Sequence, residues 1–170
     1  MEHPFFIRPA YLGDREAVDR LFAASYPDLL PQDYDRGVLK GALPIITSAQ
    51  DALLTSGTYY LAECAETDEV VGAGGWTDVS PTRGVGNPQQ GHVRHVATRS
   101  DWLRRGVAKA LIDVTLASAG AHGMTKMACM STHTARAFYH AMGFDERGEV
   151  ELTLAPGVHF PAVQMQIDLC

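Results

Sequence analysis

Alternating and helical spacings of hydrophobic residues divide the chain into short strands and amphipathic helices. Short runs rich in β-branched and aromatic side chains, bounded by glycine, proline or acidic turns, predict strands. These strands span residues 5–8, 58–64, 70–77, 92–98, 125–130, 150–154 and 163–169. Apolar residues that recur every third or fourth position predict helices. The helices span residues 14–25, 32–41, 48–56, 105–121 and 133–142.

The order of these elements predicts one α/β domain over residues 1–170. The second and third strands flank an acidic turn at residues 66–69, which predicts an antiparallel hairpin. Helices separate the later strands, which favours a single mixed seven-stranded sheet with helices on both faces. Gly72, Gly74 and Gly75 lie inside the third strand and predict that another element packs close to its backbone.

Composition narrows the class of protein. With 46% hydrophobic and 20% charged residues, the chain resembles a globular domain that buries its own core. No apolar run approaches about 18 residues, so we expect no membrane partner. A net charge of −6 argues against a nucleic acid partner, because nucleic-acid-binding surfaces are basic. The three cysteines form no disulfide framework, which favours a reducing, cytoplasmic location.

The segment Leu103–Lys109 has the character of an anion site. It joins the fourth predicted strand to the fourth predicted helix. The first N–H groups of a helix lack partners within it and carry the positive end of its dipole. Arg104 and Arg105 would neutralise a phosphate there, and Gly106 would let that phosphate approach the backbone. The alternative is a pair of solvated charges, since the segment matches neither a Walker loop nor a dinucleotide fingerprint.

A second group of residues lies in the last predicted helix. Ala135, Phe138, Tyr139 and Met142 follow the spacing of one helical face. That spacing favours Tyr139 as a core residue. A buried tyrosine must still satisfy its hydroxyl, and at a cleft between sheet and helix the hydroxyl would serve as an acid.

Together and in this order, the two segments resemble the GNAT superfamily of acetyl-CoA-dependent N-acyltransferases. The family pattern is [QR]-x-x-G-x-[GA] at a helix start, then a strand, then A-x-x-F-Y-x-x-x-G-F. The resemblance covers most of the chain and implies the GNAT fold, with a splay between the fourth and fifth strands where acetyl-CoA binds. In this chain the motifs read Leu103-Arg104-Arg105-Gly106-Val107-Ala108 and Ala135-Arg136-Ala137-Phe138-Tyr139-His140-Ala141-Met142-Gly143-Phe144.

The resemblance also implies a path for the cofactor. The pantetheine arm would run beside the fourth strand, which often carries a bulge, and would bond the backbone at Val96 and Thr98. Two departures from the pattern affect this path. Leu103 replaces the usual Gln or Arg and removes one phosphate-side contact, and Thr132 replaces an Asn whose bonding its hydroxyl can partly supply. The pyrophosphate would lie on the backbone of Arg104, Arg105, Gly106, Val107, Ala108 and Lys109.

Alternation along the fourth strand separates its polar side chains. His92, Arg94, Val96 and Thr98 would share one face, and His95 would occupy the other. In GNAT family members with a base on this strand, the matching position is His92 or Arg94. An imidazole titrates near pH ~6.5, so His92 is the candidate base, acting directly or through a water. The alternative for His92 is a surface histidine at a strand end, and His95 is expected to be structural.

The implied reaction transfers an acetyl group from acetyl-CoA to a primary amine of a small molecule or peptide. The amine would attack directly in a ternary complex, with the Val96 N–H polarising the thioester carbonyl. Tyr139 would donate its proton to the departing CoA thiolate. No metal is expected, because the histidines and cysteines lack ligand spacing.

Two other hypotheses fit the same residues. One is a catalytically silent acyl-CoA-binding sensor or regulatory module, for which the departures at Leu103 and Thr132 leave room. The other is an unrelated α/β protein that binds ATP or NAD. The resemblance alone suggests a homodimer formed through the last strands. The acceptor is expected between segments 26–57, 78–90 and 155–162, with an aromatic lining from Tyr26, Tyr34, Trp76, His159 and Phe160.

Overall fold

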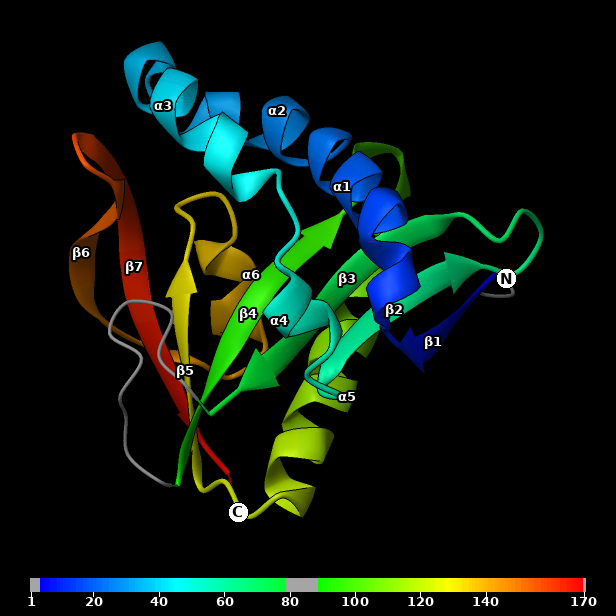
Figure 1. The fold of residues 1–170 in the computed structure, drawn as a ribbon. Helices are drawn as coiled ribbons and strands as arrows, with labels where there is room; N and C mark the ends of the chain where they lie inside the picture. Colours follow the sequence, from blue (N-terminus) through cyan, green and yellow to red (C-terminus); the bar gives the residue numbers. More distant parts are fainter. Residues whose placement is uncertain (1–3, 79–88, 170) are drawn as a thin grey trace.

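Seven strands form one mixed sheet in the computed structural model, which describes residues 4–78 and 89–169 (Figure 1). The spatial order is β1-β2-β3-β4-β5-β7-β6. Neighbouring strands are antiparallel except β4 and β5, which run parallel. The predicted mixed seven-stranded sheet is therefore confirmed. Its strands are β1 (Phe5–Pro9), β2 (Tyr59–Cys64), β3 (Val70–Thr77), β4 (Gln90–Thr98), β5 (Lys126–Ser131), β6 (Asp145–Ala155) and β7 (Val158–Asp168).

Helices cover both faces of the sheet, as predicted (Figure 1). The N-terminal helices lie on one face: α1 (Arg15–Ala23), α2 (Tyr26–Leu29), α3 (Arg36–Ile46) and α4 (Asp51–Leu54). The opposite face carries α5 (Val107–Ala121) and α6 (Arg136–Ala141). Three short 3-10 helices complete the described chain: η1 (Leu12–Asp14), η2 (Leu30–Gln32) and η3 (Ser100–Trp102). None of the helices in the described ranges has the length and apolar character needed to cross a membrane.

The sheet separates two apolar cores. On the N-terminal helix face, Phe22 of α1 packs with Tyr59 and Leu61 of β2. On the other face, Ile112 of α5 packs with Met165 of β7. All five side chains are at most 1% exposed, so burial of apolar surface fixes α1 and α5 against the sheet.

The glycines of β3 bring α5 and β2 close to the backbone of β3. A Cβ atom built on Gly72 would overlap Cγ1 of Val107, the first residue of α5. A Cβ atom on Gly75 would overlap the carbonyl oxygen of Thr58. The predicted close approach at β3 is confirmed, and at Gly72 the packed element is α5.

Several element boundaries differ from the prediction. β6 and β7 each span 11 residues, because the exposed, charged first half of β6 pairs with β7 although it lacks hydrophobic alternation. The helix predicted to end at Gly41 continues through Pro44 to Ile46. The Thr47 backbone N–H and side-chain hydroxyl both donate to the Leu43 carbonyl, which closes the helix after Pro44.

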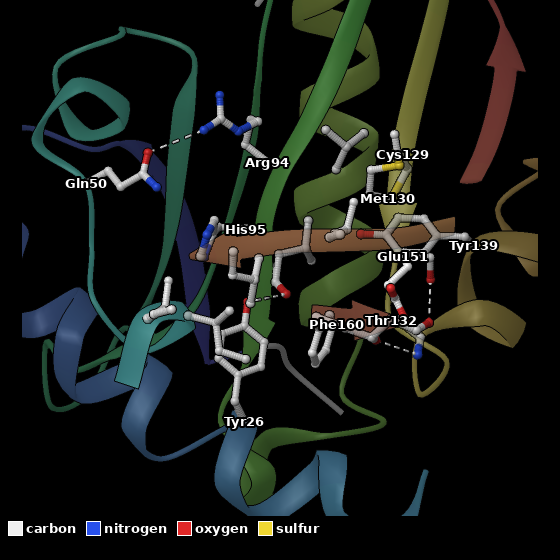
Figure 2. A pocket seen from close by; sticks show the side chains of 18 of the residues that line it. Tyr26, Gln50, Arg94, His95, Cys129, Met130, Thr132, Tyr139, Glu151 and Phe160 are labelled. Atoms are coloured by element: carbon white, nitrogen blue, oxygen red, sulfur yellow. Dashed lines mark hydrogen bonds between the residues drawn. The ribbon is translucent and has the colours of Figure 1, made fainter. Parts of the chain in front are cut away.

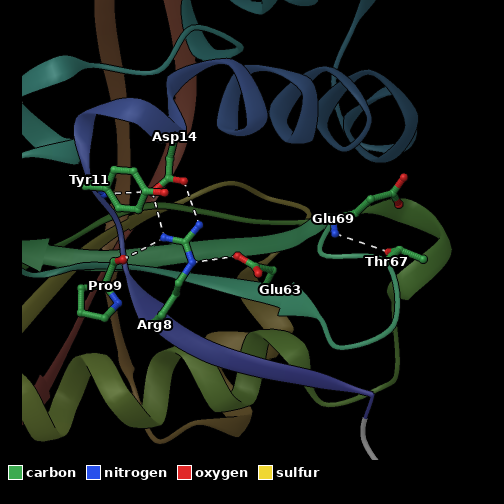
Figure 3. Close-up of polar contacts among 7 residues, drawn as sticks. All are labelled: Arg8, Pro9, Tyr11, Asp14, Glu63, Thr67 and Glu69. Carbon is green, nitrogen blue, oxygen red and sulfur yellow. Dashed lines mark hydrogen bonds and ion pairs between the residues drawn. The ribbon is translucent and has the colours of Figure 1, made fainter.

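A charged network ties β1 to its neighbours (Figure 3). Arg8 of β1 donates through Nε to Glu63 of β2 at 2.8 Å and through its terminal nitrogens to Asp14 of η1 at 2.8 and 2.9 Å. The Tyr11 N–H also donates to Asp14, at 2.9 Å. Burial alone would raise the pKa of Asp14, but the hydrogen bonds from Arg8 and Tyr11 outweigh it and lower the pKa. This network fastens the edge strand and the start of α1.

Candidate active site

The central parallel strands diverge. β4 pairs with β5 only from Gln90–His92 to Lys126–Ala128. On its other side β4 pairs with β3 as far as Thr98. Within residues 4–78 and 89–169, the backbone edge of residues 93–98 that faces β5 therefore has no strand partner. The expected splay between the fourth and fifth strands is confirmed, and it opens a gap within the sheet.

A β-bulge at His95 changes which way the side chains of β4 point. His95 has a φ of 40°, and the pairing with β3 shifts register there. Strict alternation placed His95 opposite His92 and Arg94, and this prediction is wrong. The His95 ring packs at 5.2 Å from Phe22 of α1, while Val96 belongs to the core beneath α5. After the bulge, His95 faces the N-terminal helices.

Two tyrosine hydroxyls hold this bulge. The Tyr59 hydroxyl donates to the His95 carbonyl at 2.6 Å. The Tyr26 hydroxyl donates to the Val96 carbonyl at 3.4 Å. Both hydroxyls come from other elements, β2 and α2, so the strained backbone of β4 is fixed from outside the strand.

A cavity of about 530 Å³ opens at the splay (Figure 2). Its size suits a small ligand together with the end of a cofactor arm. One wall comes from β4 and the N-terminal helices, and the other from β5, α6 and the β6–β7 hairpin. Among the five proposed aromatic lining residues, Tyr26 and Phe160 line the cavity, whereas Tyr34, Trp76 and His159 do not.

Tyr139 of α6 lies in this cavity, beside Cys129 of β5 (Figure 2). It is 4% exposed. Burial, with a smaller contribution from Cys129, raises the pKa of Tyr139 well above its usual value. Its hydroxyl is therefore protonated at neutral pH and can donate a proton. Tyr139 therefore packs in the core, as its helical spacing predicted, and also borders the cavity.

The two histidines of β4 differ in position. His92 is 7% exposed and does not line the cavity, and its Nε2 has no hydrogen-bond partner in the described part of the chain. Burial and then Arg94 lower the pKa of His92. His95 lines the cavity, and its buried Nδ1 is also without a partner among the described residues. Burial and Arg94 lower the pKa of His95 to about 4, so both rings are neutral at pH 7.

The predicted anion loop forms a backbone turn into α5. Arg104 and Gly106 have positive φ of 62° and 82°, and the first helical bond runs from the Ala110 N–H to the Gly106 carbonyl. The N–H groups at the start of α5 therefore point away from the helix with no partner within it. A Cβ on Gly106 would meet no heavy atom within 4 Å, so the space above the turn is open.

The charged side chains around this loop are solvent-accessible. The Arg105 guanidinium lies 4.6 Å from the centre of the Trp102 ring, which orients it. Lys109 pairs with Asp113 at 2.8 Å, one turn along α5. Exposed cations around unpartnered N–H groups fit the diphosphate of a cofactor. Leu103 is 44% exposed and offers no polar contact there.

Thr132 and Thr98 lie at different points of the splay. Thr132 lines the cavity, and its hydroxyl oxygen accepts a hydrogen bond from the Ala135 N–H at 3.0 Å. Its own proton can still donate toward the cavity. Thr98 is buried at the end of β4 and does not line the cavity. Among residues 4–78 and 89–169, no three His, Cys, Asp or Glu side chains are placed to hold a metal ion.

The sequence reasoning did not identify His95 or Cys129 as cavity residues. For His95 the signal was hidden, because a bulge is set by the neighbouring strand and breaks the alternation that a sequence displays. Cys129 lies next to Tyr139 only after α6 packs on β5. Burial raises the pKa of the Cys129 thiol to about 12, which makes it a poor nucleophile.

Comparison with known proteins agrees with this geometry. The chain superimposes on the GCN5-related N-acetyltransferase "Aminotransferase, Class-II" of Rhodopseudomonas palustris, with a TM-score of 0.79, 20% identity, and 99% and 98% of the two chains covered. It superimposes on the PaiA N-acetyltransferase of Thermoplasma acidophilum in complex with coenzyme A, with a TM-score of 0.73, 10% identity, and 99% and 100% covered. A third structure is Rv2747 of Mycobacterium tuberculosis in complex with CoA and NLQ, with a TM-score of 0.64, 16% identity, and 97% and 99% covered.

These three likenesses show the fold. No match was found among curated proteins. The sequence model of the acetyltransferase (GNAT) family matches residues 16–144, which include the divergent strands, the turn into α5 and the helix that carries Tyr139. The chain therefore belongs to the acetyltransferase (GNAT) family.

Proposed function

We propose that this protein transfers an acetyl group from acetyl-CoA to a primary amine, by direct attack of the amine in a ternary complex. One observation carries the proposal: a cavity at the splay between β4 and β5 contains a protonated, buried tyrosine hydroxyl. The acceptor class is a small molecule or a peptide. The solved complexes of PaiA and Rv2747 with CoA support a CoA-dependent reaction for this fold.

Acetyl-CoA would supply the activated acetyl group. The backbone of residues 104–109 would hold its pyrophosphate, with charge from Arg104, Arg105 and Lys109. The unpaired edge of β4 at Val96 and Thr98 would bond the pantetheine amides, as a neighbouring strand does. The Thr132 hydroxyl faces the same cavity and would add a donor.

Two proton transfers complete the proposed mechanism. An acceptor that resembles a lysine side chain has a pKa of about 10, so it must lose a proton before attack. His92 would accept that proton through a water, since it lies outside the cavity lining and is neutral at pH 7. Tyr139 would donate its proton to the CoA sulfur. The Val96 N–H would polarise the acetyl carbonyl, while Tyr26 holds the carbonyl side of the same residue.

Thiol release measured over a panel of amines tests this proposal. We expect acetyl-CoA to raise the melting temperature and at least one amine to accelerate CoA release. Tight CoA binding with no amine-dependent release would favour the acyl-CoA sensor instead. Stabilisation by ATP or NAD, with none by CoA, would indicate a nucleotide-binding protein.

A further inference from the structure

Arg94 of β4 is a half-buried cation in the cavity, and among the described residues it has no acidic partner. Three arginines in the described ranges are partly buried, namely Arg8, Arg94 and Arg99, and the others there are exposed. Arg8 pairs with two carboxylates at 2.8 Å, and Arg99 pairs with two at 2.6 and 2.7 Å. Arg94 contacts no carboxylate within 4 Å in residues 4–78 and 89–169. Among the described residues, no carboxylate therefore balances the charge of Arg94, in contrast to Arg8 and Arg99.

The hydrogen bonds that Arg94 does make are to neutral oxygens. One terminal nitrogen donates to the Thr77 hydroxyl at 3.0 Å. The other donates to the Gln50 amide oxygen at 3.4 Å, a bond drawn in Figure 2. A guanidinium has five N–H donors in a planar fork, so several stay available to an anion. Thr77 and Gln50 hold the fork in place from β3 and from the residue before α4. The arrangement orients Arg94 without neutralising it.

The rest of the cavity adds an opposite charge and an apolar wall. Glu151 of β6 is the one carboxylate among the described lining residues, and its side chain is 66% exposed at the rim. Its carboxylate lies 3.6 Å from Nδ1 of His159. Most of the wall formed by α3 and the β6–β7 hairpin is apolar: beside Glu151 and Thr153 it contains Ile45, Ile46, Leu152, Leu154 and Phe160.

We infer that the acceptor is a free amino acid with an apolar side chain, whose carboxylate binds Arg94. This inference rests on the proposed acetyl transfer. Arg94 and Val96 lie on either side of the bulge at His95, and both line the cavity. A carboxylate bound to Arg94 would therefore lie close to Val96, where the amine attacks the acetyl carbonyl. This placement suits a small molecule that carries both a carboxylate and an amine. Glu151 would attract the ammonium group, and the apolar wall would bury the side chain.

Binding to the CoA-loaded protein tests the inference without turnover. The probes are L-leucine, L-methionine and L-phenylalanine, each compared with its amide, which keeps the amine and side chain and lacks the negative charge. We expect at least one amino acid to bind about tenfold to a hundredfold more tightly than its amide, as for a charge-assisted bidentate pair. Isothermal titration calorimetry measures both affinities.

Substitution of Arg94 separates this contact from the fold and from CoA binding. Arg94→Met should remove the preference for the acid, while the Kd of CoA stays within twofold. Arg94→Lys should retain part of the preference, because it keeps the charge and loses the fork; this variant carries the test if Arg94→Met does not fold. Arg36→Met, an exposed arginine at the start of α3, is the matched control and should change neither affinity.

Three results would overturn the inference. Amides that bind as tightly as the acids, or an acid preference that survives Arg94→Met, would show that Arg94 does not hold a carboxylate. Failure of all three amino acids to bind at millimolar concentration, with CoA still bound, would do the same. If the unmodified protein does not bind CoA at all, the proposed function fails together with the inference. Measuring CoA binding therefore distinguishes failure of the inference alone from failure of the proposed function.

Discussion

Replacing Gly106 with alanine tests the anion loop, and the chain offers a matched control for it. Gly106 and Gly57 have nearly the same positive φ, 82° and 81°. An added Cβ would meet no heavy atom within 4 Å at either position. Gly106 precedes α5 at the proposed phosphate site, whereas Gly57 lies in the turn between α4 and β2. The two substitutions therefore differ only in their surroundings.

Both substitutions should lower the free energy of unfolding by the same amount. An alanine in the left-handed region costs about 1–2 kcal/mol, which for a chain of this length lowers the melting temperature by about 2–8 °C. At Gly106 the methyl group also enters the space where a phosphate would approach the N–H groups of α5. Loss of one charge-assisted hydrogen bond, about 1.5–3 kcal/mol, weakens CoA binding by about tenfold to a hundredfold.

Calorimetry with CoA and a thermal melt of each variant measure the two effects separately. We expect Gly57→Ala to bind CoA as the unmodified protein does and Gly106→Ala to bind it weakly. Equal CoA affinity in the two variants would refute the placement of the pyrophosphate on this loop. If Gly106→Ala loses much more stability than Gly57→Ala, the turn before α5 itself requires glycine for the fold.

Three further predictions concern proton transfer and pH. Tyr139→Phe should lower kcat by at least tenfold while the Kd of CoA stays unchanged, and an unchanged kcat would remove Tyr139 from the mechanism. In the folded protein the pKa of His95 is about 4, below its ordinary 6.5. As the pH falls, the unfolded chain therefore takes up a proton on this ring at a higher pH than the folded protein does. The free energy of unfolding should therefore fall by about 3 kcal/mol as the pH falls from 6.5 toward 4. In His95→Phe, the urea denaturation midpoint should depend much less on pH over that range. The pKa of Asp14 is lowered from 3.8, so its bonds with Arg8 stabilise the fold fully above that pH, and this stabilisation is lost progressively as the pH falls further; Asp14→Asn should cost about 2 kcal/mol at pH 7 and progressively less as the pH falls below 3.8.

The elements that the sequence predicted well are those with strong local signals. The hairpin of β2 and β3 has an acidic turn, and the glycines of β3 have no role in a strand except to admit a close neighbour. Gly106 lies at the start of α5, as expected, although α5 begins at Val107 rather than at residue 105. Tyr139 follows the helical spacing that brings it to the sheet.

The features that the sequence concealed depend on partners far along the chain. The bulge at His95 arises from the register between β3 and β4 and from hydroxyls donated by Tyr59 and Tyr26. The charged half of β6 is a strand only because β7 supplies its hydrogen bonds. Arg94 could be assigned to a strand, but its lack of a carboxylate partner is a property of the folded cavity.

The short contact between β4 and β5 has a mechanical consequence. In the described part of the sheet, the strand pairing between the half-sheet β1–β4 and the half-sheet β5–β7 consists of only three residue pairs, between Gln90–His92 and Lys126–Ala128. The two halves can rotate about this point without breaking any other ladder of hydrogen bonds. A ligand that bonds the free edge of β4 acts as a missing strand and stiffens the hinge. Amide hydrogen exchange along residues 93–98 should therefore slow when CoA binds, and the two half-sheets should then unfold as one cooperative unit.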